Sequence, residues 1–210
     1  MPLLLPRFYA IIDRSILPRR ALAELAGALL EAGVQLIQLR SKEAATQAFF
    51  DDARELVSLL APAGAALIIN DRADVAALAG AAGVHLGQDD LPVAAARAQL
   101  GPEKLIGFST HTAEQLAAAG ALPADYLAIG PIFATRTKLE TEPVLGCARL
   151  SEARPRTKKP LVAIGGITPA NAAEVIAAGA DSVAVAADWL AAPDIRARLE
   201  EFRRALGRLD

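Results

Sequence analysis

Two carboxylates follow neighbouring apolar stretches of the sequence and stand 19 residues apart. Asp71 comes directly after the run AALIIN, and Asp90 closes the segment GVHLGQDD. Carboxylate oxygens are ligands that Mg²⁺ takes in proteins, commonly one or two of them, with water and substrate phosphate completing the shell. An aspartate that precedes a helix can instead cap it, because its side chain accepts a backbone N–H of the first turn. Both interpretations, a magnesium site and a pair of helix caps, are carried forward.

Basic side chains form a second group, suited to an anion. Arg40 and Lys42 alternate at the end of the apolar run VQLIQLR, Gln38 shares their period-2 face, and Lys138 lies in GPIFATRTK. An arginine inside an apolar strand needs an anionic partner, and its planar guanidinium suits phosphate or carboxylate. Two acids, a divalent ion and three bases around one cavity would form a diphosphate site.

The elements that position these residues follow a repeating pattern. Helical stretches end in glycine or proline and are followed at once by a short apolar run, as in AAGVHL and AAGADSVAV, and RFYAIID completes a set of eight. Such runs, buried on both faces, are typical of a parallel sheet. The pattern predicts one domain over residues 1–210, a closed (β/α)₈ TIM barrel. A doubly wound open sheet is the competing layout, although no G-x-G-x-x-G follows the first strand.

Active sites of such barrels lie at the carboxyl ends of the strands, so the polar residues there should converge on one mouth. Phosphate is commonly bound after strands seven and eight, near a helix N-terminus. Gly165 and Gly166 in IGGITPAN are candidates for that role, although a tight turn would also explain them. The long segment 134–146 is expected to form a lid or a binding loop.

The two histidines lead to different expectations. His85 lies within the predicted strand GVHL and is expected to be a hydrogen-bonded core residue. His111 follows the fifth predicted strand on the mouth side, close enough to the site to contact a ligand.

Composition excludes several classes of partner. The net charge of −2, from 22 basic and 24 acidic residues, argues against nucleic acid and lipid surfaces as general partners. A single cysteine, Cys147, fits a reducing compartment. No apolar run approaches the roughly 20 residues that span a bilayer, and MPLLLPRFYA lacks the basic residue that would begin a signal peptide. We expect a cytoplasmic protein with small-molecule substrates, and the composition allows a homo-oligomer.

Five segments carry a resemblance to a known family. QLRSK, IINDRADVAALAGAAGVHLGQDD, IGFSTHT, AIGPIFATRTK and VAIGGITPANAAEVIAAGAD resemble thiamine phosphate synthases in order and spacing, from about Phe8 to Val185. The resemblance implies a (β/α)₈ barrel and a Mg²⁺-dependent transferase. Its substrates would be hydroxymethylpyrimidine diphosphate and a thiazole phosphate or its carboxylated form, and its products thiamine phosphate and diphosphate. In this family diphosphate is thought to leave first, and the thiazole nitrogen then captures the pyrimidine methylene cation.

The resemblance also assigns residues by position. It implies that Asp71 and Asp90 bind Mg²⁺. It implies a pyrimidine diphosphate site made of Gln38, Arg40, Lys42, Asn70, Ser109 and Lys138, of which Arg40, Lys42, Ser109 and Lys138 are expected to act in catalysis. It implies a thiazole phosphate site made of Thr135, Thr137, Gly166, Ala186 and Ala187. Ala187 stands where the family usually has serine, and Ile12 stands where threonine is common.

Two other functions remain open. A thiazole tautomerase of the same superfamily would use His111 as its acid and base. A non-catalytic barrel would bind a ligand without converting it. The paired motifs ND and GQDD favour the synthase, because they have no evident task without a metal and a diphosphate.

Overall fold

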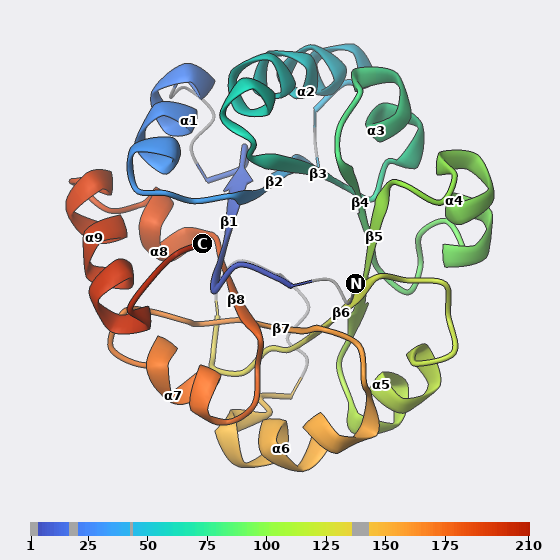
Figure 1. Cartoon of the computed structure of the whole chain (residues 1–210), viewed down its shortest axis with the longest axis vertical. Helices are drawn as coiled ribbons and strands as arrows, with labels where there is room; N and C mark the ends of the chain where they lie inside the picture. The colour runs from blue at the N-terminus through green and yellow to red at the C-terminus, as the bar shows by residue number, and fades with distance from the viewer. Residues whose placement is uncertain (1–3, 17–20, 43, 136–142) are drawn as a thin grey trace.

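Eight parallel strands pair in chain order and close into a barrel, β1 with β8, and helices surround them (Figure 1). The computed structural model describes residues 4–16, 21–42, 44–135 and 143–210. The pairing of β1 with β8 confirms the predicted (β/α)₈ barrel and excludes an open sheet. Within the described residues, no helix has the length and apolar character needed to cross a membrane.

The strands are short, as expected for a parallel barrel. They are β1 (Phe8–Asp13), β2 (Leu36–Arg40), β3 (Ala66–Asn70), β4 (Gly83–Leu86), β5 (Leu105–Thr110), β6 (Tyr126–Ile129), β7 (Leu161–Ile164) and β8 (Ser182–Val185). The α-helices are α1 (Leu22–Glu31), α2 (Thr46–Leu60), α3 (Ala73–Ala79), α4 (Val93–Leu100), α5 (Ala113–Ala119), α6 (Gly146–Ala153), α7 (Ala172–Ala177), α8 (Ala187–Leu190) and α9 (Ile195–Leu206), and the 3₁₀ turns are η1 (Ala61–Ala63) and η2 (Arg154–Arg156).

Alternate strand residues feed two separate apolar clusters, because successive side chains point to opposite faces of a strand. Ile37 and Leu39 of β2 pack outward against helix residues such as Leu56. Leu36 of the same strand belongs to a smaller cluster inside the barrel, which also contains Ile68. Both faces of the strands are therefore buried, and this explains why the strands read as apolar runs without regular polar alternation.

Strands β4 and β5 approach closely at Gly83, which is paired with Leu105. A Cβ at Gly83 would lie 2.0 Å from the backbone oxygen of Leu105. That contact is far inside van der Waals range, so only glycine fits between the two strands at this point.

We expect Gly83→Ala to destabilise the barrel, because the backbone of a central strand cannot move aside without disturbing its pairing. Overpacking of this kind costs about 1–3 kcal/mol. Gly27→Ala in α1 is the matched control: nothing lies within 4 Å of a Cβ there, and alanine in a helix is favoured over glycine by roughly 0.5–1 kcal/mol. Urea unfolding of both variants provides the measurement, and a Gly83→Ala midpoint at or above wild type would contradict this account.

Candidate functional site

The carboxyl ends of β3 and β4 bring Asp71 and Asp90 together. Asp71 follows β3 with a left-handed φ of 63°, and its backbone N–H donates to the His85 carbonyl at 2.8 Å. Asp90 Oδ2 accepts the backbone N–H of Gly87 at 2.6 Å, which folds the loop after β4 back toward its strand. Aspartate tolerates the left-handed region better than most residues, and such conformations cluster at functional sites.

Neither aspartate caps the helix that follows it. The N-cap positions of α3 and α4 are occupied by Arg72 and Pro92, and neither makes a side-chain capping bond. Elsewhere in the chain capping does occur, since Thr112 accepts the Gln115 N–H at the start of α5. The helix-cap interpretation of Asp71 and Asp90 is therefore wrong, and both carboxylates face other partners.

The carboxyl group of Asp71 is strongly affected by its surroundings, Asp90 included. Burial, with the hydrogen bond and charge of Asp90, raises the pKa of the Asp71 carboxyl from 3.8 to about 6, against the opposing charges of Arg40 and Lys42. The two carboxyls thus lie within hydrogen-bonding reach, with two cations near enough to act on them. Such a pair either shares a proton or binds a cation that neutralises both charges.

Arg40 is held by a buried acid on the neighbouring strand. Asp13 and Arg40 are register partners at the ends of β1 and β2, and Arg40 Nη1 donates to Asp13 Oδ2. Asp13 also accepts the backbone N–H of Ser15 at 3.0 Å and its hydroxyl at 2.6 Å. The sequence indicated an anionic partner for Arg40 but not this one, and only strand register identifies Asp13.

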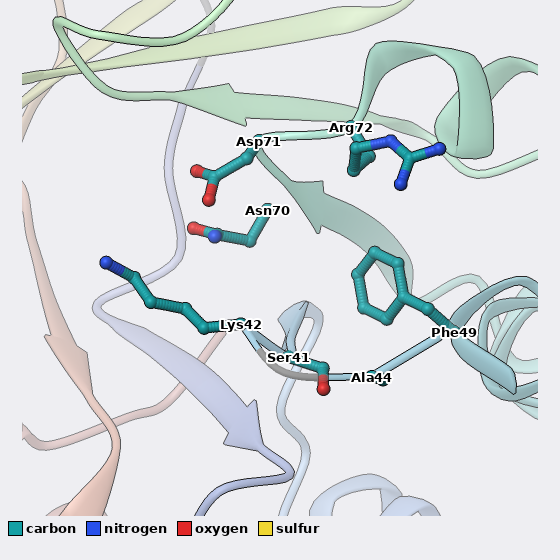
Figure 2. Close-up of a pocket in the computed structure, with 7 residues that line it drawn as sticks. All are labelled: Ser41, Lys42, Ala44, Phe49, Asn70, Asp71 and Arg72. Carbon is teal, nitrogen blue, oxygen red and sulfur yellow. The ribbon is translucent and has the colours of Figure 1, made fainter. Parts of the chain in front are cut away.

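A cavity of about 300 Å³ opens beside this group, between the loop after β2 and the end of β3 (Figure 2). The cavity is lined by Ser41, Lys42, Ala44, Phe49, Asn70, Asp71 and Arg72. In Figure 2 the Lys42 ammonium, the Asn70 amide and the Asp71 carboxylate project to the same side, whereas Arg72 turns away. Arg72 Nη2 instead pairs with Asp74 Oδ2 at 2.6 Å. Lys42 and Asn70 therefore lie on the same side of the cavity as the Asp71 carboxylate, whereas Arg72 forms an ion pair away from it.

Two other predicted site residues, Gln38 and Ser109, do not line this cavity. Gln38 is buried, and its Nε2 donates to Tyr9 Oη at 2.8 Å. Ser109 near the end of β5 has its Oγ 2.8 Å from His85 Nε2. His85 is a buried, hydrogen-bonded residue as predicted, but it contacts a predicted site residue directly, which strand spacing alone did not indicate.

His111 follows β5 and has a fixed ring orientation. Its Nδ1 lies 2.7 Å from the Gly130 carbonyl oxygen, which can only accept, so Nδ1 carries the proton. In the neutral ring Nε2 is then the basic nitrogen.

The described members of the second predicted group follow β6, β7 and β8. Gly166 has a φ of 63°, and a Cβ there would lie 2.6 Å from the Ala134 carbonyl oxygen. The loop after β7 therefore packs against the segment that leads into Thr135. Ala186 and Ala187 follow β8, with Ala186 at the N-cap of α8. Thr137 and Lys138 lie outside the described residues.

We expect the stability of the metal-free protein to fall, relative to Asp71→Asn, as pH rises from about 4 to above 6. The folded-state pKa of Asp71 is raised from 3.8 to about 6, so its stabilising contribution is complete below the unfolded value and is lost as pH passes the folded one. Asparagine keeps the left-handed backbone without titrating. Urea unfolding in chelator across this range measures the difference.

Asp74→Asn is the control for that experiment. Arg72 lowers the pKa of Asp74, so the contribution of Asp74 is lost as pH falls and its difference curve has the opposite sign. Parallel curves for wild type and Asp71→Asn would contradict the shared-proton account of the pair.

Comparisons with known proteins identify the family of this chain. A family model described as thiamine monophosphate synthase matches residues 8–188. A thiamine-phosphate synthase of Koribacter versatilis is 50% identical over 206 residues, 96% of each chain, and one of Albidiferax ferrireducens is 48% identical over 188 residues, 90% of this chain and 86% of that one. The solved thiamine phosphate pyrophosphorylase of Pyrococcus furiosus matches with a TM-score of 0.86 and 34% identity, covering 96% of this chain and 95% of that one. The chain therefore belongs to the thiamine monophosphate synthase family.

Proposed function

We propose that this chain is a transferase that joins hydroxymethylpyrimidine diphosphate to a thiazole phosphate, or its carboxylated form, and releases thiamine phosphate and diphosphate, with carbon dioxide as a further product from the carboxylated form. One observation carries the proposal within this family. Asp71 and Asp90 cap no helix, and they lie together at one barrel mouth, where the positive charges of Arg40 and Lys42 act on the Asp71 carboxyl. That combination of acids and bases suits a metal-bound diphosphate.

The metal in this proposal is Mg²⁺, with Asp71 and Asp90 as its protein ligands. No group of three or more histidine, cysteine, aspartate or glutamate side chains converges anywhere in the described part of the chain, and this site offers two carboxylates. Two carboxylates, completed by water and substrate phosphate oxygens, fit the coordination that Mg²⁺ takes. When bound, the ion supplies positive charge against the departing diphosphate.

The chain's own residues meet the rest of that charge. The bond between the pyrimidine methylene carbon and the diphosphate oxygen breaks, and the electron pair leaves on the diphosphate. Arg40 and Lys42 face that developing charge, joined by Lys138 as the sequence predicts. Asp13 holds the Arg40 guanidinium in place beforehand, so little reorganisation is needed as charge develops. The thiazole nitrogen then donates its lone pair to the methylene carbon, a step that requires no general base.

Orientation of the two substrates falls to polar groups around the mouth. In this proposal Gln38, Asn70 and Ser109 contact the pyrimidine diphosphate. Thr135 and Thr137, with the backbone at Gly166 and at the Ala186–Ala187 pair, bind the thiazole phosphate. Alanine at 187 offers a backbone N–H and no hydroxyl, so phosphate binding there depends on main-chain donors. Holding the nucleophile in line accounts for a large part of the rate in such a reaction.

The direct assay mixes purified protein with both substrates, with and without Mg²⁺, and follows diphosphate and thiamine phosphate together. We expect the two products in equal amounts, and only when both substrates and the ion are present. Conversion of the thiazole alone would instead indicate a tautomerase that uses His111. Binding of both substrates without turnover would indicate a ligand-binding barrel. Either result would overturn the proposal.

Asp71→Asn and Asp90→Asn should each lower kcat by about 100-fold or more, the scale of losing one group that stabilises charge in a transition state. Folding should persist, because neither carboxylate caps a helix. Asp89→Asn is the matched control, since Asp89 is exposed and adjacent to Asp90. Initial rates across a Mg²⁺ titration, with circular dichroism as the folding check, make the comparison. Wild-type rates in the Asp71 or Asp90 variant at any Mg²⁺ concentration would rule out the proposed metal ligands.

A further inference from the structure

Five polar side chains form a continuous chain of hydrogen bonds across the barrel interior, from β2 to β5. Gln38 Nε2 donates to Tyr9 Oη at 2.8 Å, and Tyr9 Oη lies 3.0 Å from Tyr126 Oη. Tyr126 Oη lies 3.1 Å from His85 Nδ1, and His85 Nε2 lies 2.8 Å from Ser109 Oγ. This series of hydrogen bonds, here called the relay, therefore links two predicted pyrimidine-site residues, Gln38 and Ser109. The three residues between them, Tyr9, Tyr126 and His85, have no assigned role in the site.

Strand register and a glycine make this chain possible. His85, Gly107 and Tyr126 are register partners on β4, β5 and β6. A Cβ at Gly107 would lie 2.2 Å from the Tyr126 ring and 2.4 Å from His85 Nδ1. Glycine on the middle strand thus allows the side chains of its two neighbours to touch across it. The contact between His85 and Tyr126 is built into the barrel.

The direction of the hydrogen bonds follows from counting protons. Burial raises the pKa of both phenols, so Tyr9 and Tyr126 keep their single protons at neutral pH. With Gln38 Nε2 donating to Tyr9, both phenol protons have an acceptor only if Tyr9 donates to Tyr126 and Tyr126 donates to His85 Nδ1. Any other order leaves a buried phenol proton without an acceptor among the described residues, which is unfavourable. His85 then carries its proton on Nε2 and donates it to Ser109 Oγ.

The opposite direction is complete only if the Gln38 amide is rotated so that its oxygen accepts from Tyr9. The Ser109 hydroxyl would then donate its proton to His85 Nε2 in a hydrogen bond. In the direction that follows from Gln38 Nε2 as the donor to Tyr9, the Ser109 hydroxyl proton remains available to an anion. A site that binds a diphosphate needs hydrogen-bond donors. The direction deduced from the phenol protons leaves Ser109 as such a donor.

We propose that Tyr9, Tyr126 and His85 are positioning residues that fix His85 as the Nε2–H tautomer and thereby hold Ser109 Oγ as a hydrogen-bond donor toward the pyrimidine diphosphate. The identity of that ligand rests on the proposed function. The tautomer does not, because it is a property of the protein alone.

Nitrogen-15 NMR of histidine-labelled protein at pH 8 tests the tautomer. The sequence has 2 histidines, and His111→Gln leaves His85 as the only labelled ring. We expect His85 Nδ1 to show the shift of an unprotonated ring nitrogen, and His111, whose Nδ1 donates to Gly130, to show the opposite tautomer. Tyr126→Phe should abolish the single tautomer of His85. A protonated Nδ1 on His85 in the wild type would overturn the proposal whether or not the protein is a synthase.

Kinetics test the consequence for the site. Tyr126→Phe keeps the ring and removes one hydroxyl, so kcat/KM for the pyrimidine diphosphate should fall about 3–10-fold, the scale of one hydrogen bond, with KM for the thiazole phosphate unchanged. Thr110→Val is the matched control: Thr110 neighbours Ser109, is buried, and its Oγ1 donates to the Ala128 carbonyl at 2.8 Å. This variant should lose stability and keep both KM values.

The kinetic outcomes are separable. Equal effects of Tyr126→Phe and Thr110→Val on the pyrimidine kcat/KM would reduce the relay to a packing role and overturn the proposal. Absence of condensation by the wild type would remove the proposed function, and the NMR experiment would still decide the direction of the relay.

Discussion

Closure of the barrel by parallel pairing of β1 with β8 is the constraint on which the candidate site depends. Parallel strands all end at the same rim, so closure brings residues from distant parts of the chain around one mouth. Asp13 and Arg40 meet because their strands are in register there, and Asp71 and Asp90 meet because the next two strands end beside each other. An open sheet would keep these neighbouring pairs but would not bring the ends of β1 and β8 together.

The unfavourable electrostatic interaction between Asp71 and Asp90 at the barrel mouth is consistent with a site for a cation. Two partly buried carboxyls in hydrogen-bonding reach repel when both are ionised, and burial together with this repulsion raises the pKa of Asp71. Nearby cations relieve it only in part. A site that binds a divalent ion and an anion together must keep charged side chains that are not fully neutralised when the ligands are absent. Such a site lowers the free energy of unfolding of the ligand-free protein. The buried Asp13–Arg40 pair differs, because Ser15 completes the hydrogen bonds of its carboxylate.

The interior of this barrel combines apolar packing with a polar relay. Aliphatic residues such as Leu36, Ile68 and Val162 fill part of it, as is usual for the fold. Tyr9, Tyr126 and His85 contribute polar atoms that would be costly if unpaired, and the relay pairs them in sequence. A network that is fully satisfied holds its members rigidly. The same bonds therefore satisfy the core and orient two residues of the mouth.

The sequence by itself determined the strands, their order and most of the mouth. Glycine-terminated helices followed by apolar runs predicted the barrel, and Asp71, Asp90, Arg40 and Lys42 could be identified because strand ends in this fold share one rim. Tertiary structure decided what depends on contacts distant in sequence. It excluded capping by Asp71 and Asp90, paired Arg40 with Asp13, and joined Tyr9 to Tyr126, which are 117 residues apart. Local patterns specify where a strand ends, whereas hydrogen-bond partners across a barrel are set by register and closure.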